Sequence, residues 1–293
     1  MTWRSEQIAW AWDGKPVTVA QTSHGDGPTV LMLPALSSIS TRREMRPLQQ
    51  QLGGSFRTVA IDWPGFGDLP RPKIDWRPEA YRAFLKQAAE RLRPAATIAV
   101  GHAAGYALAE AAETEAALGA LSLISPTWRG PLPTMTGKRI AAFRSVARAV
   151  DWPVLGALLH RLNVNRPVIG MMARGHVYAD PAWLTPERLR DKLAVTEAAG
   201  ARYASVRFVV GELDAFREGA EFLSAAARIR TPLQVVFGAQ APRKSKVDMV
   251  ALAALDHVQA TELPVGKLSV YEEYPEQVAP VVAAFLRSNP TTG

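Results

Sequence analysis

The chain has 293 residues, of which 48% are hydrophobic and 21% are charged, with a net charge of +7 and no cysteine. This composition is typical of a globular protein and excludes an intrinsically disordered chain. The absence of cysteine excludes disulfides, thiolate metal sites and a cysteine nucleophile. The first residues contain no apolar signal-peptide core, and no stretch is apolar for long enough to span a bilayer. We therefore expect a soluble, cytoplasmic protein.

The positive charge is concentrated in the middle of the chain. Residues 126–175 contain eight arginines and lysines but only one acid, Asp151. No helix-turn-helix, zinc or RNP-type motif accompanies them, so nucleic-acid binding is not expected. Within this segment Arg144 and Arg148 lie one helical turn apart, beside apolar residues at helical spacing. The pattern predicts a basic amphipathic helix, which either packs over a pocket or makes peripheral contact with an anionic membrane.

The first half of the chain alternates predicted strands with predicted helices. Short apolar runs have the character of buried strands, and they are separated by segments of helical periodicity. The alternation predicts a mostly parallel, doubly wound sheet with helices on both faces. The predicted strands are 8–12 and 16–21, which form a hairpin, then 29–33, 57–61, 97–100 and 121–124; the predicted helices are 41–52, 77–92 and an alanine-rich helix that ends near Ala116.

The alternation stops at Ser125 and resumes in the last third of the chain. The intervening segment is helical in pattern and contains several prolines, which predicts an insertion that covers the sheet. We therefore divide the chain into a core of residues 1–125 and 206–293 and a helical cap of residues 126–205. In the second part of the core the predicted strands are 208–211, 233–237 and 259–263, and the predicted helices are 247–257 and 275–286.

The most informative motif is Gly101-His102-Ala103-Ala104-Gly105, which lies between a predicted strand and a predicted helix. A Gly-x-x-x-Gly motif in this position has the layout of a nucleophile elbow, a tight turn that points its central residue into a pocket. Here the chain resembles the α/β-hydrolase superfamily over nearly its whole length. The other landmarks that carry the resemblance are 33–36, the Asp62-x-x-Gly-x-Gly turn, 235–238 and the segment 263–275.

The resemblance implies that all three positions of the Ser-Asp-His triad are vacant. Ala103 occupies the nucleophile position, Ala241 the acid position and Lys267 the histidine position. Because the triad acts as a unit, the loss of any one member removes most of the rate. An engineered Ser-to-Ala change at position 103 would leave the acid and the base in place, and neither is visible. The remaining alternatives for these roles are Asp214 as an acid and His257, which we interpret as a helix-surface residue.

The residues around the vacant triad could still form a site. The resemblance implies an oxyanion or anion-binding nest built from the backbone N–H groups of Leu36 and Ala104. His102 precedes the central residue of the elbow, where it could pack against the turn or take part in catalysis. Ser37, Trp128 and His176 are candidates for the pocket lining. Of the hydroxyl residues after the third strand, we expect Ser40 or Thr41 to cap the following helix.

Three functions remain open. The first is a non-hydrolytic or atypical enzyme that acts on a small carbonyl-bearing, anionic or lipophilic substrate, with Lys267 reaching toward Ala103 as acid, base or charge clamp. The second is a catalytically inactive member of the fold that binds a ligand or partner. The third is an ester or thioester hydrolase that carries a Ser-to-Ala change. No cofactor or metal motif is present, so we expect none, with a small molecule as the partner. The sequence leaves the oligomeric state undetermined.

Overall fold

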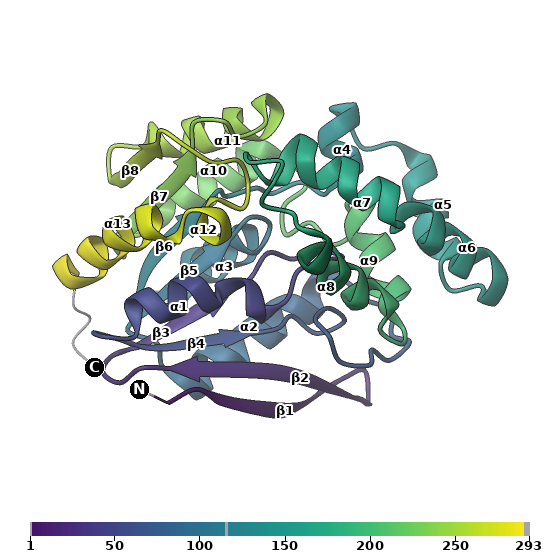
Figure 1. Ribbon diagram of the computed structural model, residues 1–293, viewed down its shortest axis with the longest axis horizontal. Helices are drawn as coiled ribbons and strands as arrows, with labels where there is room; N and C mark the ends of the chain where they lie inside the picture. Colours follow the sequence, from purple (N-terminus) through teal and green to yellow (C-terminus); the bar gives the residue numbers. More distant parts are fainter. Residues whose placement is uncertain (1, 115–116, 290–293) are drawn as a thin grey trace.

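The computed structural model describes residues 2–114 and 117–289, which form an eight-stranded sheet surrounded by helices (Figure 1). The strand order is β1-β2-β4-β3-β5-β6-β7-β8, and all strands from β4 onward in this order run parallel. The predicted fold class is therefore confirmed. The strands are β1 Arg4–Trp12, β2 Lys15–His24, β3 Thr29–Leu33, β4 Arg57–Ile61, β5 Ala96–Val100, β6 Ala120–Ile124, β7 Leu233–Gly238 and β8 Val258–Leu263.

The predicted hairpin forms the edge of the sheet. Strands β1 and β2 pair antiparallel, with Trp12 opposite Lys15, and β2 then pairs antiparallel with β4. The two residues between β1 and β2, Asp13 and Gly14, have φ angles of 48° and 71°. Two successive residues with positive φ make the tight turn whose twist matches that of the paired strands.

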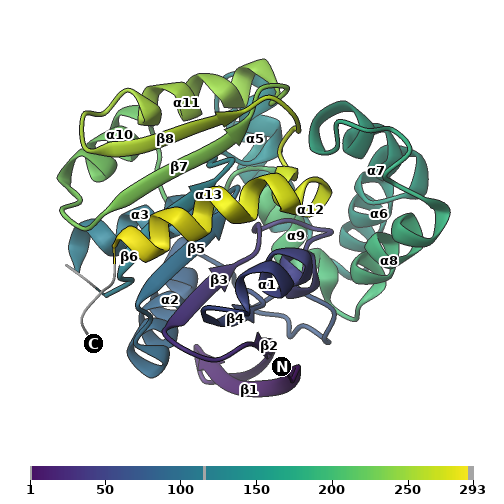
Figure 2. The same cartoon turned by 60° about the vertical axis from the view of Figure 1, so that its left-hand side comes forward.

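Helices cover both faces of the sheet, as Figure 2 shows for α13 on the near face. On one face α1 packs against α13, and their apolar side chains meet Met32 and Ile98 of the central strands. On the other face α3 packs against α2 and α10, and the core there includes Trp63 and Tyr106. These helices are α1 Arg46–Leu52, α2 Pro78–Leu92, α3 Ala103–Glu113, α10 Gly219–Arg228, α11 Arg243–Ala253, α12 Val270–Glu273 and α13 Pro275–Ser288.

Some boundaries differ from those expected. The predicted helix 41–52 is a short 3-10 helix, η1 Arg42–Met45, followed by α1, and Thr41 caps η1 by accepting a hydrogen bond from the Arg43 N–H. The predicted helix 247–257 ends at Ala253, so His257 lies in the turn before β8. The expected end of α3 near Ala116 lies outside the described residues.

The Asp62-x-x-Gly-x-Gly turn is fixed by hydrogen bonds to Arg42 of η1 and by the close packing of Gly67 on Asp62. The carboxylate of Asp62 accepts hydrogen bonds from the backbone N–H of Arg42 at 2.5 Å and from its guanidinium at 2.7 Å. Gly67 has a φ of 82°, and a Cβ atom there would lie 2.5 Å from an Asp62 carboxylate oxygen. The motif requires glycine at this position because both the backbone conformation and the space exclude a side chain.

The segment from the end of β6 to the end of α9 is helical, apart from loops, and stands to one side of the sheet (Figures 1 and 2), whereas α10, which follows it before β7, packs against α3. The prediction of a strand at 208–211 is wrong, because these residues form the end of α9 and the turn after it. None of the described helices is long and apolar enough to cross a membrane. The helices of the segment that we expected to form the cap are α4 Pro131–Thr136, α5 Ala141–Ala149, α6 Pro153–Asn163, α7 Arg166–Met172, the π-helix η2 Ala173–Val177, α8 Pro186–Glu197 and α9 Ala201–Val209, so the expected boundary at residue 205 falls inside α9.

Candidate functional site

The turn between β5 and α3 has its left-handed residue at Gly101, two residues before the position that we expected. Gly101 has a φ of 55°, whereas Ala103 already belongs to α3 and is fully buried in the core. A Cβ atom at Gly101 would lie 3.4 Å from the Cβ of Ala35, in the loop after β3. Glycine is favoured here because a left-handed backbone is costly for residues that carry a side chain.

Backbone hydrogen bonds fix this turn. The N–H of Gly101 donates to the carbonyl of Ile124 at 2.9 Å, and its carbonyl accepts from the N–H groups of Ala104 at 3.2 Å and Thr127 at 3.0 Å. The Ala104 N–H, which we expected to serve in an anion nest, therefore already has an acceptor. The other expected N–H belongs to Leu36, whose side chain is fully buried in the core.

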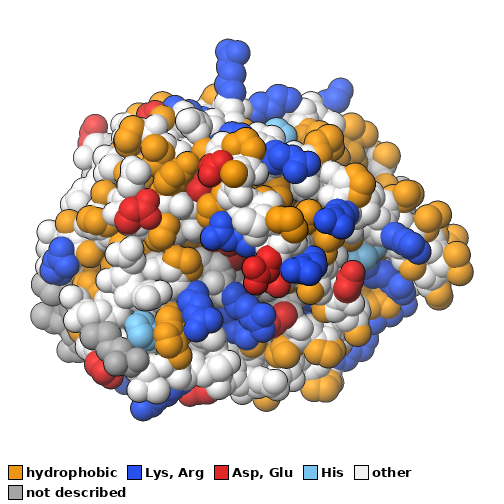
Figure 3. All heavy atoms as spheres, viewed as in Figure 1, with side chains coloured by type: hydrophobic (Ala, Val, Ile, Leu, Met, Phe, Trp, Pro, Cys, Tyr) orange, Lys and Arg blue, Asp and Glu red, His pale blue; other side chains and the backbone are white. Residues whose placement is uncertain are grey.

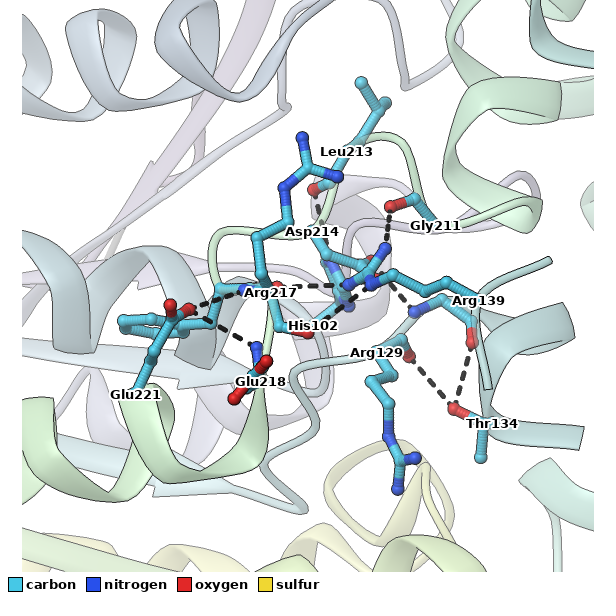
Figure 4. A network of polar contacts seen from close by, with 12 residues as sticks. His102, Arg129, Thr134, Arg139, Gly211, Leu213, Asp214, Arg217, Glu218 and Glu221 are labelled. Atoms are coloured by element: carbon cyan, nitrogen blue, oxygen red, sulfur yellow. Dashed lines mark hydrogen bonds and ion pairs between the residues drawn. The ribbon is translucent and has the colours of Figure 1, made fainter. Parts of the chain in front are cut away.

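His102 is the N-cap of α3, and its ring points away from solvent into a polar network (Figure 4). Its Nε2 lies 3.3 Å from a carboxylate oxygen of Asp214 and 3.3 Å from the carbonyl of Leu213. Phe208 packs edge-on against the imidazole at 5.3 Å between ring centroids. Burial lowers the pKa of His102 to about 4, because the charged imidazolium is poorly solvated there. The ring is therefore neutral at pH 7.

Asp214 joins the elbow to the start of the cap. Its carboxylate receives a 2.5 Å hydrogen bond from the Arg139 guanidinium and a 2.9 Å bond from the Gly130 N–H. Arg139 also donates to the carbonyl of Gly211 at 2.6 Å. Burial raises the pKa of Asp214 to about 7, although Arg139 opposes this shift. The carboxylate of Asp214 is buried, and its two hydrogen bonds tie the loop after α9 to the segments that carry Gly130 and Arg139.

The loops after β7 and β8 meet, as the resemblance implies for an acid and a base. The N–H of Gln240 donates to the carbonyl of Gly266 at 3.2 Å, which places Ala241 and Lys267 on adjoining loops. The ammonium group of Lys267 donates to the carbonyl of Arg174 in the cap at 2.7 Å. Lys267 thus links the β8 loop to the cap through the same ammonium group that we expected to act at Ala103.

One further residue at this end of the sheet was missed by sequence reasoning. Ser125 follows β6 directly, is fully buried and has a φ of 46°, one of three described non-glycine residues with positive φ. Its Oγ donates to the backbone carbonyl of Lys267 at 3.5 Å. Its position at the carboxyl end of a predicted strand was visible in the sequence, but its backbone conformation was not.

A second buried cluster, also missed, lies where the cap meets the core. The Lys192 ammonium contacts the carboxylates of Glu44 and Glu272, and Tyr178 and Tyr271 donate to Glu272 and Glu44 at 2.9 Å each. Burial raises the pKa of Glu272 to about 7, while Lys192 opposes this shift. Burial lowers the pKa of Lys192, but the two carboxylates outweigh it and leave that pKa well above its usual value.

The pocket candidates from the sequence are dispersed. Ser37 accepts a hydrogen bond from the Ile39 N–H, Trp128 is buried and stacks on Phe222, and His176 is exposed on η2. Among residues 2–114 and 117–289, no hydrogen bond or ring contact joins any two of these three side chains. A cavity of about 370 Å³ that is open to solvent lies within the cap, between α7 and α8, and is lined by Arg166, Pro167, Gly170, Arg174, Leu184, Pro186 and Leu189.

No cluster of three histidine, aspartate or glutamate side chains suitable for a metal ion occurs in residues 2–114 and 117–289.

The model of the alpha/beta hydrolase family matches residues 24–281, nearly the whole chain. The chain belongs to this family. A comparison with curated proteins returned no match.

Several solved structures share the fold. A thermophilic esterase from Thermogutta terrifontis superposes with a TM-score of 0.75 at 18% identity, covering 98% of this chain and 100% of the esterase. A haloalkane dehalogenase from Agrobacterium tumefaciens C58 gives 0.71 at 16% identity, with 97% of each chain covered. An epoxide hydrolase from Acinetobacter nosocomialis gives 0.71 at 15%, covering 96% and 89%. At these identities the likeness establishes the fold and leaves the reaction open.

Proposed function

We propose that this alpha/beta hydrolase acts by binding a ligand and not by triad hydrolysis. The observation that carries the proposal is the turn between β5 and α3, where the residue with the left-handed backbone is Gly101. Glycine has no side chain with which to attack a substrate. The adjoining loops carry Ala241 and Lys267 in place of an acid and a histidine, so the carboxylate and imidazole that activate a triad nucleophile are missing there.

The remaining titratable groups near the turn are committed to structure. His102 and Asp214 are buried and contact each other, and Arg139 pairs with the same carboxylate. The third function, an engineered hydrolase, loses support for a separate reason. Ala103 lies in the first turn of α3 within the core, so a serine there would place its hydroxyl among apolar side chains.

The cavity between α7 and α8 supports a ligand with an anionic group and an apolar body. Arg166 and Arg174 contribute guanidinium groups, which bind carboxylates and phosphates through paired hydrogen bonds. Leu184 and Leu189 supply apolar surface on the same cavity. A volume of about 370 Å³ lies within the range of small-molecule sites.

Hydrolysis of a short activated ester tests the catalytic part of the proposal. We expect no turnover above the buffer rate for the wild type, for Ala103→Ser or for Gly101→Ser, because a lone serine would have neither base nor acid beside it. Turnover by the wild type, or a gain of several orders of magnitude in either variant, would overturn the proposal. Circular dichroism of each variant verifies that it is folded.

Ligand binding tests the other part. A medium-chain fatty acid should bind more tightly than the matching alcohol in calorimetry, and Arg166→Gln/Arg174→Gln should remove this preference. The exposed Arg190, on the same helix α8 but outside the cavity, provides the control variant Arg190→Gln. Equal binding of acid and alcohol by the wild type would contradict an anion-selective cavity.

A second candidate function retains Lys267 as a reactive group. Its support is Ser125, whose positive φ is strained for a serine and whose Oγ contacts the Lys267 backbone. In this alternative Ser125 would be the nucleophile and Lys267 the base of an atypical enzyme. Labelling by a fluorophosphonate probe that is lost in both Ser125→Ala and Lys267→Met would favour it over pure binding.

A further inference from the structure

The outer face of the cap carries an uncovered apolar surface. Of the ten large hydrophobic side chains that are exposed in the described residues, eight lie between positions 135 and 171. Val154 of α6 is 83% exposed, and Trp152 just before α6 is 66% exposed. We define the outer cap face by its exposed apolar side chains, Ile140, Trp152, Val154, Leu155, Leu158, Leu162 and Met171.

The apolar side chains of α6 share one side of the helix. Val154, Leu158 and Leu162 are spaced four residues apart, which places them along a single stripe. The opposite side of α6 is fixed to the protein: His160 contacts the carbonyl of Thr196 at 3.0 Å, and α6 packs against α9. The stripe therefore faces outward because the other face of the helix is already occupied.

The basic segment that contains α6 also carries five exposed arginines. Arg144 and Arg148 are exposed on α5, and the remaining ones are Arg161, Arg166 and Arg174. In residues 2–114 and 117–289 none of these five guanidinium groups forms an ion pair with an acid. The single acid of the segment, Asp151, is neutralised by Arg207 at 2.8 Å. The segment that carries the outer cap face therefore has exposed apolar side chains and an excess of unpaired positive charge, and Figure 3 shows both kinds of side chain at the end of the molecule where α6 lies.

From this combination we propose that the outer cap face docks onto an anionic phospholipid membrane. Leucine, valine and tryptophan side chains can enter the region between headgroups and acyl chains, while the arginines bind lipid phosphates. A second copy of the chain is a poorer occupant, because it would bring two positively charged faces together. This inference does not depend on the proposed ligand binding, because Leu158, Leu162, Arg144 and Arg148, which the flotation variants change, do not line the cavity.

Flotation with lipid vesicles tests the proposal. The full chain should float with vesicles of phosphatidylcholine and phosphatidylglycerol and remain behind with pure phosphatidylcholine. Leu158→Glu/Leu162→Glu should lower the partition coefficient at least tenfold, because it places charge where apolar contact is needed. Arg144→Glu/Arg148→Glu should do so at least as strongly, and raising the salt concentration should weaken wild-type binding.

Matched controls separate the outer cap face from general surface effects. Val247→Glu/Val250→Glu changes two exposed apolar residues of α11, and Arg4→Glu/Arg230→Glu reverses two exposed charges outside the cap. Both should bind within about twofold of the wild type. Negligible recovery of wild type with anionic vesicles, equal recovery with both lipids, or equal losses in the controls would overturn the proposal. So would a dimer in analytical ultracentrifugation that Leu158→Glu/Leu162→Glu dissociates, since a second copy would then cover this face.

Discussion

The two faces of the cap differ in whether their charged side chains are paired. On the inner face, against the core, charged side chains are paired: Lys192 lies between Glu44 and Glu272, and Arg139 meets Asp214. On the outer cap face, arginines such as Arg148 are exposed beside uncovered leucines. A buried charge is tolerable only when it is paired, whereas an exposed one is solvated at little cost. The inner face therefore attaches the cap, and the outer face is available for contact.

Lys192→Met, on the inner face, should have the largest effect on the free energy of unfolding. Removal of the ammonium leaves the carboxylates of Glu44 and Glu272 buried without a cation, so the free energy of unfolding should fall by about 3–5 kcal/mol. Denaturant unfolding measures it, with the exposed Arg190→Met on the same helix as a control that should change stability by less than about 0.5 kcal/mol. Equal, small losses for both variants would show that the inner and outer faces do not differ in this way.

The pH dependence of stability sharpens the comparison. The pKa of Glu272 rises from 4.5 to about 7 on folding, so the folded protein binds this proton more tightly between those values. The free energy of unfolding should therefore fall as the pH rises through this range, by up to about 3 kcal/mol. Glu272→Gln should reduce the slope of this part of the profile, to which Asp214 also contributes, and Glu276→Gln, at an exposed position on α13, should leave it unchanged. A wild-type profile that rises over the same range would contradict the assignment.

The smallest effect is expected on the outer cap face. Leu158→Ser should change the free energy of unfolding by less than about 0.5 kcal/mol, because this side chain is 51% exposed and covers little core. The reference variant is Leu108→Ala in α3; because Leu108 is fully buried, its truncation should lower the free energy of unfolding by about 2–5 kcal/mol. Thermal unfolding measured by circular dichroism compares the two. A loss above about 2 kcal/mol for Leu158→Ser would mean that the outer face is packed.

Local sequence patterns determined most of the architecture. Apolar runs such as 29–33 and 121–124 predicted strands correctly, because a strand buried on both faces leaves an uninterrupted apolar signature. The hairpin turn at Asp13-Gly14 was also predicted correctly, because few residues adopt the backbone that a tight hairpin requires. The strand expected at 208–211 was wrong, because a short apolar run at the buried end of a helix looks like a strand.

What only the tertiary structure decided concerns contacts between distant residues. The sequence placed glycine at both ends of Gly101-His102-Ala103-Ala104-Gly105, but only the backbone showed that the left-handed turn lies at Gly101. The pairing of Glu44 with Lys192 joins residues 148 positions apart, and no local pattern encodes such a contact. The same holds for the contact of His102 with Asp214. Periodicity reports which face of an element is buried, whereas the partner on that face is set by how the elements pack.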